Sequence, residues 1–167
     1  VMQFRVADAH WHWKVWKQLF MGDPAKPDEA EDRTRVLNSV APQFFLMLKE
    51  VLFQDVILRL CKLVDAEEGG PTKARRRNFS LKGVFDDVRP QLSAARVERV
   101  DELLKEFKTA AAAFIQWRHW MFAHDDYDVA VGAQPLPPAT YSEVDSAMKI
   151  AVEIMETISP LVFWRKE

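Results

Sequence analysis

The residues of this chain best suited to chemistry are Arg118, His119 and His124, which lie close together near the end of a long helical pattern. Histidine is the side chain whose ordinary pKa lies near neutrality, and arginine is a permanent cation whose planar donor fork fits phosphate oxygens. An arginine and a histidine held together can therefore act on a phosphodiester without a metal ion. This segment is the candidate site.

Helical geometry does not by itself bring Arg118 and His124 together. On an ideal α-helix their six-residue separation places them about 120° apart around the axis and about 9 Å apart along it. His124 continues the apolar stripe beyond Met121, whereas Arg118 lies beside that stripe. Either the histidine caps a helix C-terminus while Arg118 pairs with an acidic neighbour, or the pair is functional. A functional pair requires a helix that unwinds at His124, or a second subunit that brings its own copy alongside.

The elements that position this segment are predicted to be helices. A first amphipathic helix is expected to end near Met21, and a helical segment at 28–65 is interrupted at Pro42, where a kink or a fresh start is expected. Beyond Pro42, apolar residues cover more than one side, which indicates a central, buried helix. The apolar stripe of the first helix consists of Phe4, Ala7, Trp11, Val15 and Leu19, widened by Trp16 and Phe20.

The second half of the chain gives three more helices. Ser80 is a good N-cap for a short helix over 81–88, and a long helix with one buried stripe is expected from Leu92 to Met121. Thr140 and Glu143 match a capping box that opens a last helix toward Pro160. No strand-like alternation appears between these segments. The sequence therefore predicts one all-α domain over 1–167, a bundle of about five helices with a kinked long central helix.

Composition limits the classes of partner. The 167 residues are 49% hydrophobic and 29% charged, with a net charge of −2, so any nucleic-acid contact must come from a local basic patch. Cys61 is the only cysteine, which excludes an internal disulfide framework and suits a reducing cytosol. No segment reaches the ~18 apolar residues that span a bilayer. We expect a cytoplasmic protein without a membrane partner.

Several standard sites are excluded by inspection. The sequence contains no Glu-x-x-His, His-Glu-x-x-His or paired Cys-x-x-Cys motif, and no phosphate-binding glycine loop. His10 and His12 lie about 200° apart on their helix and cannot chelate one ion from it alone. They are interpreted as surface or interface histidines. We expect no metal and no cofactor.

Arg118-His119-x-x-x-x-His124 resembles the signature of the HEPN superfamily (higher eukaryotes and prokaryotes nucleotide-binding), in which a polar residue follows the arginine. Residues 118–126 are called the signature segment from here on. Other segments resemble the abortive-infection U-type branch of this superfamily, in the same order along most of the chain. These segments are Val36-Leu37-Asn38, Ala41-Pro42-x-Phe44-Phe45, Val56-Ile57-Leu58-x-Leu60-x-x-Leu63-Val64-Asp65, Asn78-x-Ser80-Leu81 and Ala123-His124-x-Asp126.

The resemblance implies a metal-independent endoribonuclease of a defence or toxin-antitoxin system, with RNA as substrate and an antitoxin protein as a possible partner. It implies a homodimer in which the signature helices of two protomers form one cleft. His124 would act as acid or base, Arg118 would stabilise the phosphate, and His119 would orient either the phosphate or Arg118. The alternative is a non-catalytic helical dimer that binds nucleotide, nucleic acid or a protein through the same cleft.

Further residues are weaker candidates for substrate binding. Asp126 can orient His124 by accepting from its ring, but a carboxylate after a helix is equally an ordinary loop residue. Asp65 matches the family pattern, or simply caps its helix. A basic cluster in a Gly/Pro loop can track an RNA backbone, although such clusters are more often only solvated. The cluster consists of Lys73, Arg75, Arg76 and Arg77.

Overall fold

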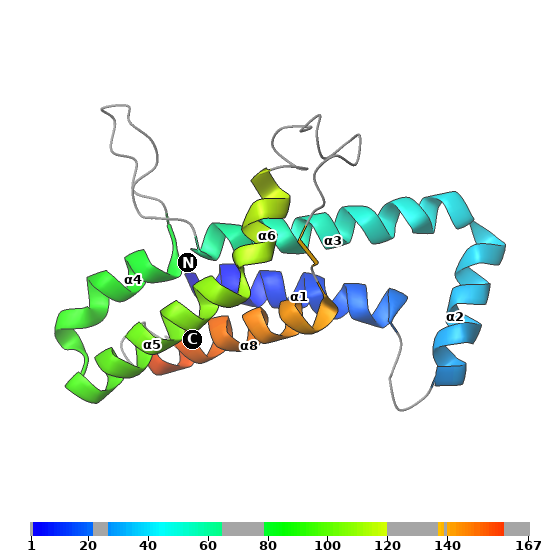
Figure 1. Ribbon diagram of the computed structural model, residues 1–167. Helices are drawn as coiled ribbons and strands as arrows, with labels where there is room; N and C mark the ends of the chain where they lie inside the picture. Colours follow the sequence, from blue (N-terminus) through cyan, green and yellow to red (C-terminus); the bar gives the residue numbers. More distant parts are fainter. Residues whose placement is uncertain (1, 22–26, 65–78, 120–136, 139, 159–167) are drawn as a thin grey trace.

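The computed structural model describes residues 2–21, 27–64, 79–119, 137–138 and 140–158 (Figure 1). Within these ranges the chain forms helices and short connections, with no strand, so the predicted all-α class is confirmed. None of the described helices is both long and apolar enough to cross a membrane. The helices are α1 (Met2–Phe20), α2 (Pro27–Val40), α3 (Pro42–Val64), α4 (Leu81–Val88), the 3-10 turn η1 (Arg89–Gln91), α5 (Ala94–Ala110), α6 (Ala112–Trp117) and α8 (Tyr141–Ile158).

Two of the expected helices are each divided in two, so the described part of the chain has seven α-helices where about five were expected. The fresh start expected at Pro42 is confirmed: Pro42 begins α3 after a corner at Ala41, because a proline lacks the N–H that an uninterrupted helix needs. The long helix expected up to Met121 breaks at Ala111, whose N–H is shared between the carbonyls of Phe107 and Thr109. Figure 1 shows α6 leaving the direction of α5 at this break.

Helix α1 buries the face opposite to the expected one. Phe4, Ala7 and Trp11 are exposed and Val15 and Leu19 are only half-buried, so that part of the prediction is wrong. Trp16 and Phe20, which widened the expected stripe, do pack in the core. Because α1 is apolar on two sides, the face with the larger aromatic area takes the core. The buried residues of α1 are Met2, Val6, Ala9, Trp13 and Trp16.

Helix α3 is buried along only part of its length, which corrects the prediction of a central, buried helix. Its C-terminal half lies beside α1 and buries Val56, Ile57, Leu60, Cys61 and Leu63. Its N-terminal half and α2 project beyond the ends of the other helices (Figure 1). Large apolar side chains there stay exposed because no described helix covers them.

The C-terminal half of the bundle follows the prediction closely. Helix α5 packs against α8, and Val100, Leu103 and Phe107 are buried between the helices. The capping box is present, because Thr140 N–H donates to Glu143 Oε2 at 2.6 Å and Glu143 N–H donates to Thr140 Oγ1 at 3.3 Å. The buried residues of α8 are Val144, Ala147, Met148, Ala151, Ile154, Met155 and Ile158.

Helix α4 has the predicted bounds and the predicted cap. The side chain of Ser80 is fully buried, and its Oγ accepts from the N–H of Gly83 at 3.3 Å. Ser93 occupies the same position before α5, but its side chain makes no capping hydrogen bond. The two serines are therefore a matched pair for measuring the cap.

We predict that Ser80→Ala lowers the free energy of unfolding by about 1 kcal/mol, because a buried N–H loses its acceptor. Ser93→Ala is expected to change it by less than about 0.5 kcal/mol. Urea denaturation of both variants checks this. Equal losses would show that the Ser80 hydroxyl does not cap α4.

Candidate signature-segment site

An aromatic cluster brings together the helices α1, α3, α6 and α8. Trp13 and Trp16 of α1 stack with their ring centroids 5.0 Å apart. Phe53 of α3 lies 5.6 Å from Trp16, and Tyr141 at the start of α8 lies 4.8 Å from Trp16. Trp117, the last residue of α6, packs edge-on against Phe53 at 6.2 Å. The residue before Arg118 is thus fixed by the core.

The indole N–H groups of three tryptophans join different elements. Trp13 Nε1 donates to Asp145 Oδ1 of α8 at 2.8 Å, and Trp16 Nε1 donates to the carbonyl of Lys49 in α3 at 2.9 Å. Trp117 Nε1 donates to the carbonyl of Pro137 at 2.8 Å. This last bond ties together the two positions, 20 residues apart, between which the signature segment lies.

Arg118 and His119 form a π-helical turn at the end of α6. The N–H of Arg118 is shared between the carbonyls of Phe114 and Ile115, the Arg118 side chain is half-buried, and His119 is exposed. Regular α-helical geometry therefore ends at Arg118.

Of the predicted site residues, the structure places Arg118 and His119 next to each other at this helix end. The other predicted residues lie outside the described residues. They are His124, Asp126, Asp65, Lys73, Arg75, Arg76 and Arg77. Among the residues that are described, no group of His, Cys, Asp and Glu side chains is arranged to hold a metal ion.

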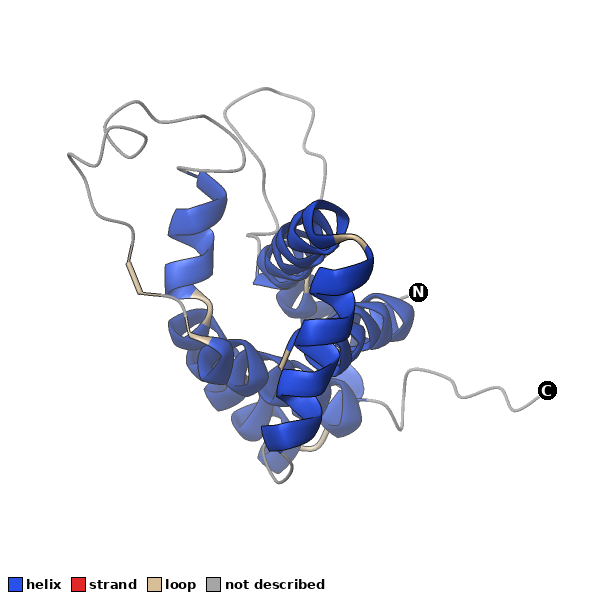
Figure 2. Ribbon diagram, turned by 90° about the vertical axis from the view of Figure 1, so that its right-hand side faces the viewer, coloured by secondary structure: helices blue, strands red, loops and turns tan. Residues whose placement is uncertain are grey.

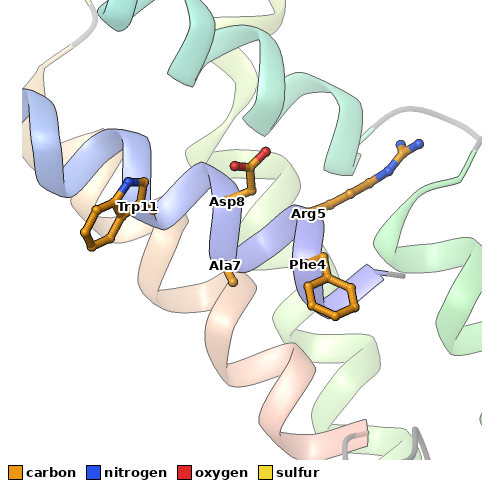
Figure 3. Close-up of a pocket in the computed structure, with 5 residues that line it drawn as sticks. All are labelled: Phe4, Arg5, Ala7, Asp8 and Trp11. Atoms are coloured by element: carbon orange, nitrogen blue, oxygen red, sulfur yellow. The ribbon is translucent and has the colours of Figure 1, made fainter.

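Two surface hollows lie away from this helix end. One, of about 480 Å³, lies along α1, where Figure 3 shows Phe4, Ala7 and Trp11 on one side of the helix and Asp8 directed to another. A second, also of about 480 Å³, lies between α1 and α8. Neither hollow includes Arg118 or His119.

A carboxylate of α8 is held by α1. Burial disfavours the charged form of Asp145, but hydrogen bonds from Lys17 at 2.7 Å and from Trp13 outweigh this and lower the pKa of the carboxyl below its ordinary value. The charged carboxylate therefore stabilises the contact between α1 and α8. No local sequence pattern predicts this pair, because Lys17 and Asp145 are 128 residues apart.

A cluster of three charged residues joins α1 to α3. Arg59 of α3 bonds both Asp55 of the same helix and Asp8 of α1. Burial opposes the charge of Arg59, but hydrogen bonds and charge attraction from Asp55 and Asp8 raise the pKa of its guanidinium above the ordinary value. His12 Nδ1 lies 3.0 Å from Asp55 Oδ2 without the alignment of a hydrogen bond. His12 is thus an interface histidine and His10 is exposed, as predicted.

Stability is expected to depend on pH through Asp145. A lowered folded-state pKa means that the stabilisation is present above the ordinary pKa and is lost as the pH falls through the folded value. The melting temperature of the wild type should exceed that of Asp145→Asn at neutral pH, and the gap should narrow below about pH 4. Asp32→Asn, at an exposed pair on α2, is the control. A gap for Asp145→Asn that stays constant with pH would contradict this.

Trp117→Phe keeps a ring against Phe53 but removes the N–H that bonds Pro137. We predict a loss of about 1 kcal/mol in the free energy of unfolding. Trp11→Phe, the same change at an exposed residue, should cost less than about 0.5 kcal/mol. Chemical denaturation of the two variants compares them. Indistinguishable values would mean that the bond does not hold the two positions together.

Comparison with known proteins agrees with the resemblance seen in the sequence. A family model of HEPN proteins, described as AbiU2, matches residues 3–163. The match extends over the described helices and includes the signature segment. No curated protein and no solved structure matches the chain.

Proposed function

This chain belongs to the AbiU2 family of HEPN abortive-infection proteins, and we propose that it is a metal-independent endoribonuclease. The observation that supports this most is the family match over residues 3–163, which contains Arg118, His119 and His124 in the order of the HEPN signature. The helix end at Arg118 is consistent with the proposal. There Trp117 packs against Phe53, and it is followed directly by the half-buried Arg118 and the exposed His119.

In the proposed reaction the ribose 2′-oxygen attacks the adjacent phosphorus. A histidine removes the 2′-hydroxyl proton, the bond from phosphorus to the 5′-oxygen breaks, and a histidine protonates that leaving oxygen. We assign these roles to His124, shared between two copies of the signature segment in a dimer. The products are a 2′,3′-cyclic phosphate and a free 5′-hydroxyl. DNA resists because it lacks the 2′-hydroxyl.

Arg118 has an electrostatic role in this proposal. Its permanent positive charge and paired N–H donors offset the negative charge that builds on the phosphate oxygens in the transition state. The turn at 118–119 is anchored through Trp117, so the cation starts from a fixed backbone position. His119 is assigned the orientation of the phosphate or of Arg118.

The proposal also includes residues that contact the substrate and a protein that inhibits the enzyme. Asp126 and Asp65 are proposed to contact substrate, and the cluster of Lys73, Arg75, Arg76 and Arg77 to contact the RNA backbone. An active ribonuclease harms its own cell, so an antitoxin protein that inhibits it is part of the proposal.

Purified protein incubated with single-stranded RNA in EDTA tests this function. Wild type is expected to cleave, and His124→Ala and Arg118→Ala are expected to lower the rate by at least about 100-fold. His10→Ala and Arg96→Ala, at exposed positions on α1 and α5, are matched controls that should keep the wild-type rate. Equal cleavage by all variants would reveal a contaminant. A wild type that binds RNA or nucleotide without cleaving it would favour the non-catalytic alternative.

A further inference from the structure

The two most exposed aromatic side chains in the described part of the chain lie on one face of α1. Phe4 is 77% exposed and Trp11 is 61% exposed. Their seven-residue separation places them about 20° apart around the helix axis and about 10 Å apart along it. Ala7 lies between them, and its small side chain leaves room for the hollow of about 480 Å³ on this face (Figure 3). We call Phe4, Ala7 and Trp11 the aromatic face.

The aromatic face points away from the protein core. Phe4 and Trp13 are nine residues apart, which places them on opposite sides of α1. Trp13 is fully buried and stacks on Trp16, so the packing that buries Trp13 turns Phe4 outward. Two large rings are therefore left in water, where a flat ligand can cover them.

The hollow suits a stacked ring better than a partner helix. A groove that holds a helix encloses its apolar side between walls. All residues that line this hollow belong to α1, so it has no second wall. A nucleobase needs only one exposed ring, because every base has a π face that stacks on an aromatic side chain. Two rings on one helix face can therefore hold two bases of one strand.

The charges of α1 suit a polyanion. The helix carries three cations, Arg5, Lys14 and Lys17, and one carboxylate, Asp8. Asp8 is bonded to Arg59 of α3, and Lys17 is bonded on the other side of the helix to α8. Lys14 follows Trp11 by three residues and is exposed. The chain as a whole has a net charge of −2, so α1 has a local excess of positive charge.

Arg5 is the second cation beside the aromatic face. Its guanidinium lies over the ring of Phe79, 5.0 Å from the ring centroid, and both residues are exposed. A guanidinium stacked on a ring keeps the N–H donors of its edge available for phosphate oxygens. The acidic side chains Glu153 and Glu156 of α8 line the other hollow, between α1 and α8. They are not among the residues that line the hollow of the aromatic face.

We propose that the aromatic face binds single-stranded nucleic acid without sequence preference. Bases stack on Phe4 and Trp11, and the two exposed cations beside these rings contact the phosphates. The hollow includes neither Arg118 nor His119, so this is a separate site from the signature segment.

The binding does not rest on the proposed ribonuclease. A DNA strand offers the same bases and phosphates to the aromatic face, but the proposed reaction cannot cut it. DNA therefore measures the binding without cleavage. If the chain is a ribonuclease, the aromatic face holds one part of a long RNA strand while the signature segment cuts another part.

Fluorescence anisotropy of a labelled oligothymidine strand tests the stacking. Wild type is expected to bind, and Phe4→Ala and Trp11→Ala are each expected to raise the Kd about fivefold or more, because a base loses its stacking partner. Trp11→Phe keeps a ring and should lose less affinity than Trp11→Ala. Phe44→Ala removes an exposed ring from α3 and should bind like wild type. Circular dichroism checks that the variants stay folded, which their exposed positions favour.

The salt dependence of the same titration tests the phosphate contacts. Lys14→Gln is expected to reduce the slope of log Kd against log salt concentration by about 1, because one fewer counterion is released. Lys108→Gln, at an exposed position on α5, is the matched control and should keep the wild-type slope.

Two results overturn the proposal. One is a wild type that does not bind the strand at low salt, even if the aromatic face then captures an acidic protein segment. The other is a pair of folded Phe4→Ala and Trp11→Ala variants that bind as tightly as wild type, which would place the binding elsewhere on the chain. Failure of the proposed ribonuclease gives a different result: these two rings bind the strand, but wild type cuts no RNA.

Discussion

The fold depends on the stacked pair of Trp13 and Trp16 at the centre of α1. Aromatic rings bury more apolar area than other side chains, so this pair decides which face of α1 enters the core. The same two indoles donate hydrogen bonds to α8 and to α3, which sets how those helices lie against α1. Through Phe53 the cluster also reaches Trp117, and it thereby fixes the start of the signature segment. The same aromatic contacts therefore determine both how the helices pack and where the signature segment begins.

Local signals in the sequence were sufficient wherever a helix has one apolar face and a marked end. Ser80 and the pair Thr140 and Glu143 each have a cap whose partners lie three residues apart, and the buried face of α8 follows from a single stripe. Periodicity failed for α1 and α3, because both are apolar on more than one side. Which side is buried then depends on neighbours distant in sequence, such as Lys49 and Tyr141 for Trp16. The N-terminal half of α3 is apolar on more than one side, which predicted burial, but no other described helix covers it and its apolar side chains stay exposed.

Only the start of the candidate site lies among the described residues. Residue chemistry singled out Arg118 and His119, which lie in a π-helical turn at the end of α6, whereas the pairing of Arg118 with His124 stays a prediction. The family membership of the chain was also recognisable from its motifs. The hydrogen bond from Trp117 to the carbonyl of Pro137 could not be predicted from local sequence. A tryptophan directly before Arg118 indicates only that this helix end is anchored by packing. His124 and Asp126 lie outside the described residues, so their roles stay predictions.

The most direct measurement of the proposed chemistry uses one short RNA and a copy with a single 2′-deoxy sugar at the cleaved position. Because the 2′-oxygen is the proposed nucleophile, the wild type should cut the RNA to a 2′,3′-cyclic phosphate and leave the substituted copy intact at that bond. Mass spectrometry of the product ends gives both results. Cleavage of the substituted copy at the same bond, or products that end in a 5′-phosphate, would contradict a ribonuclease reaction driven by Arg118 and His124.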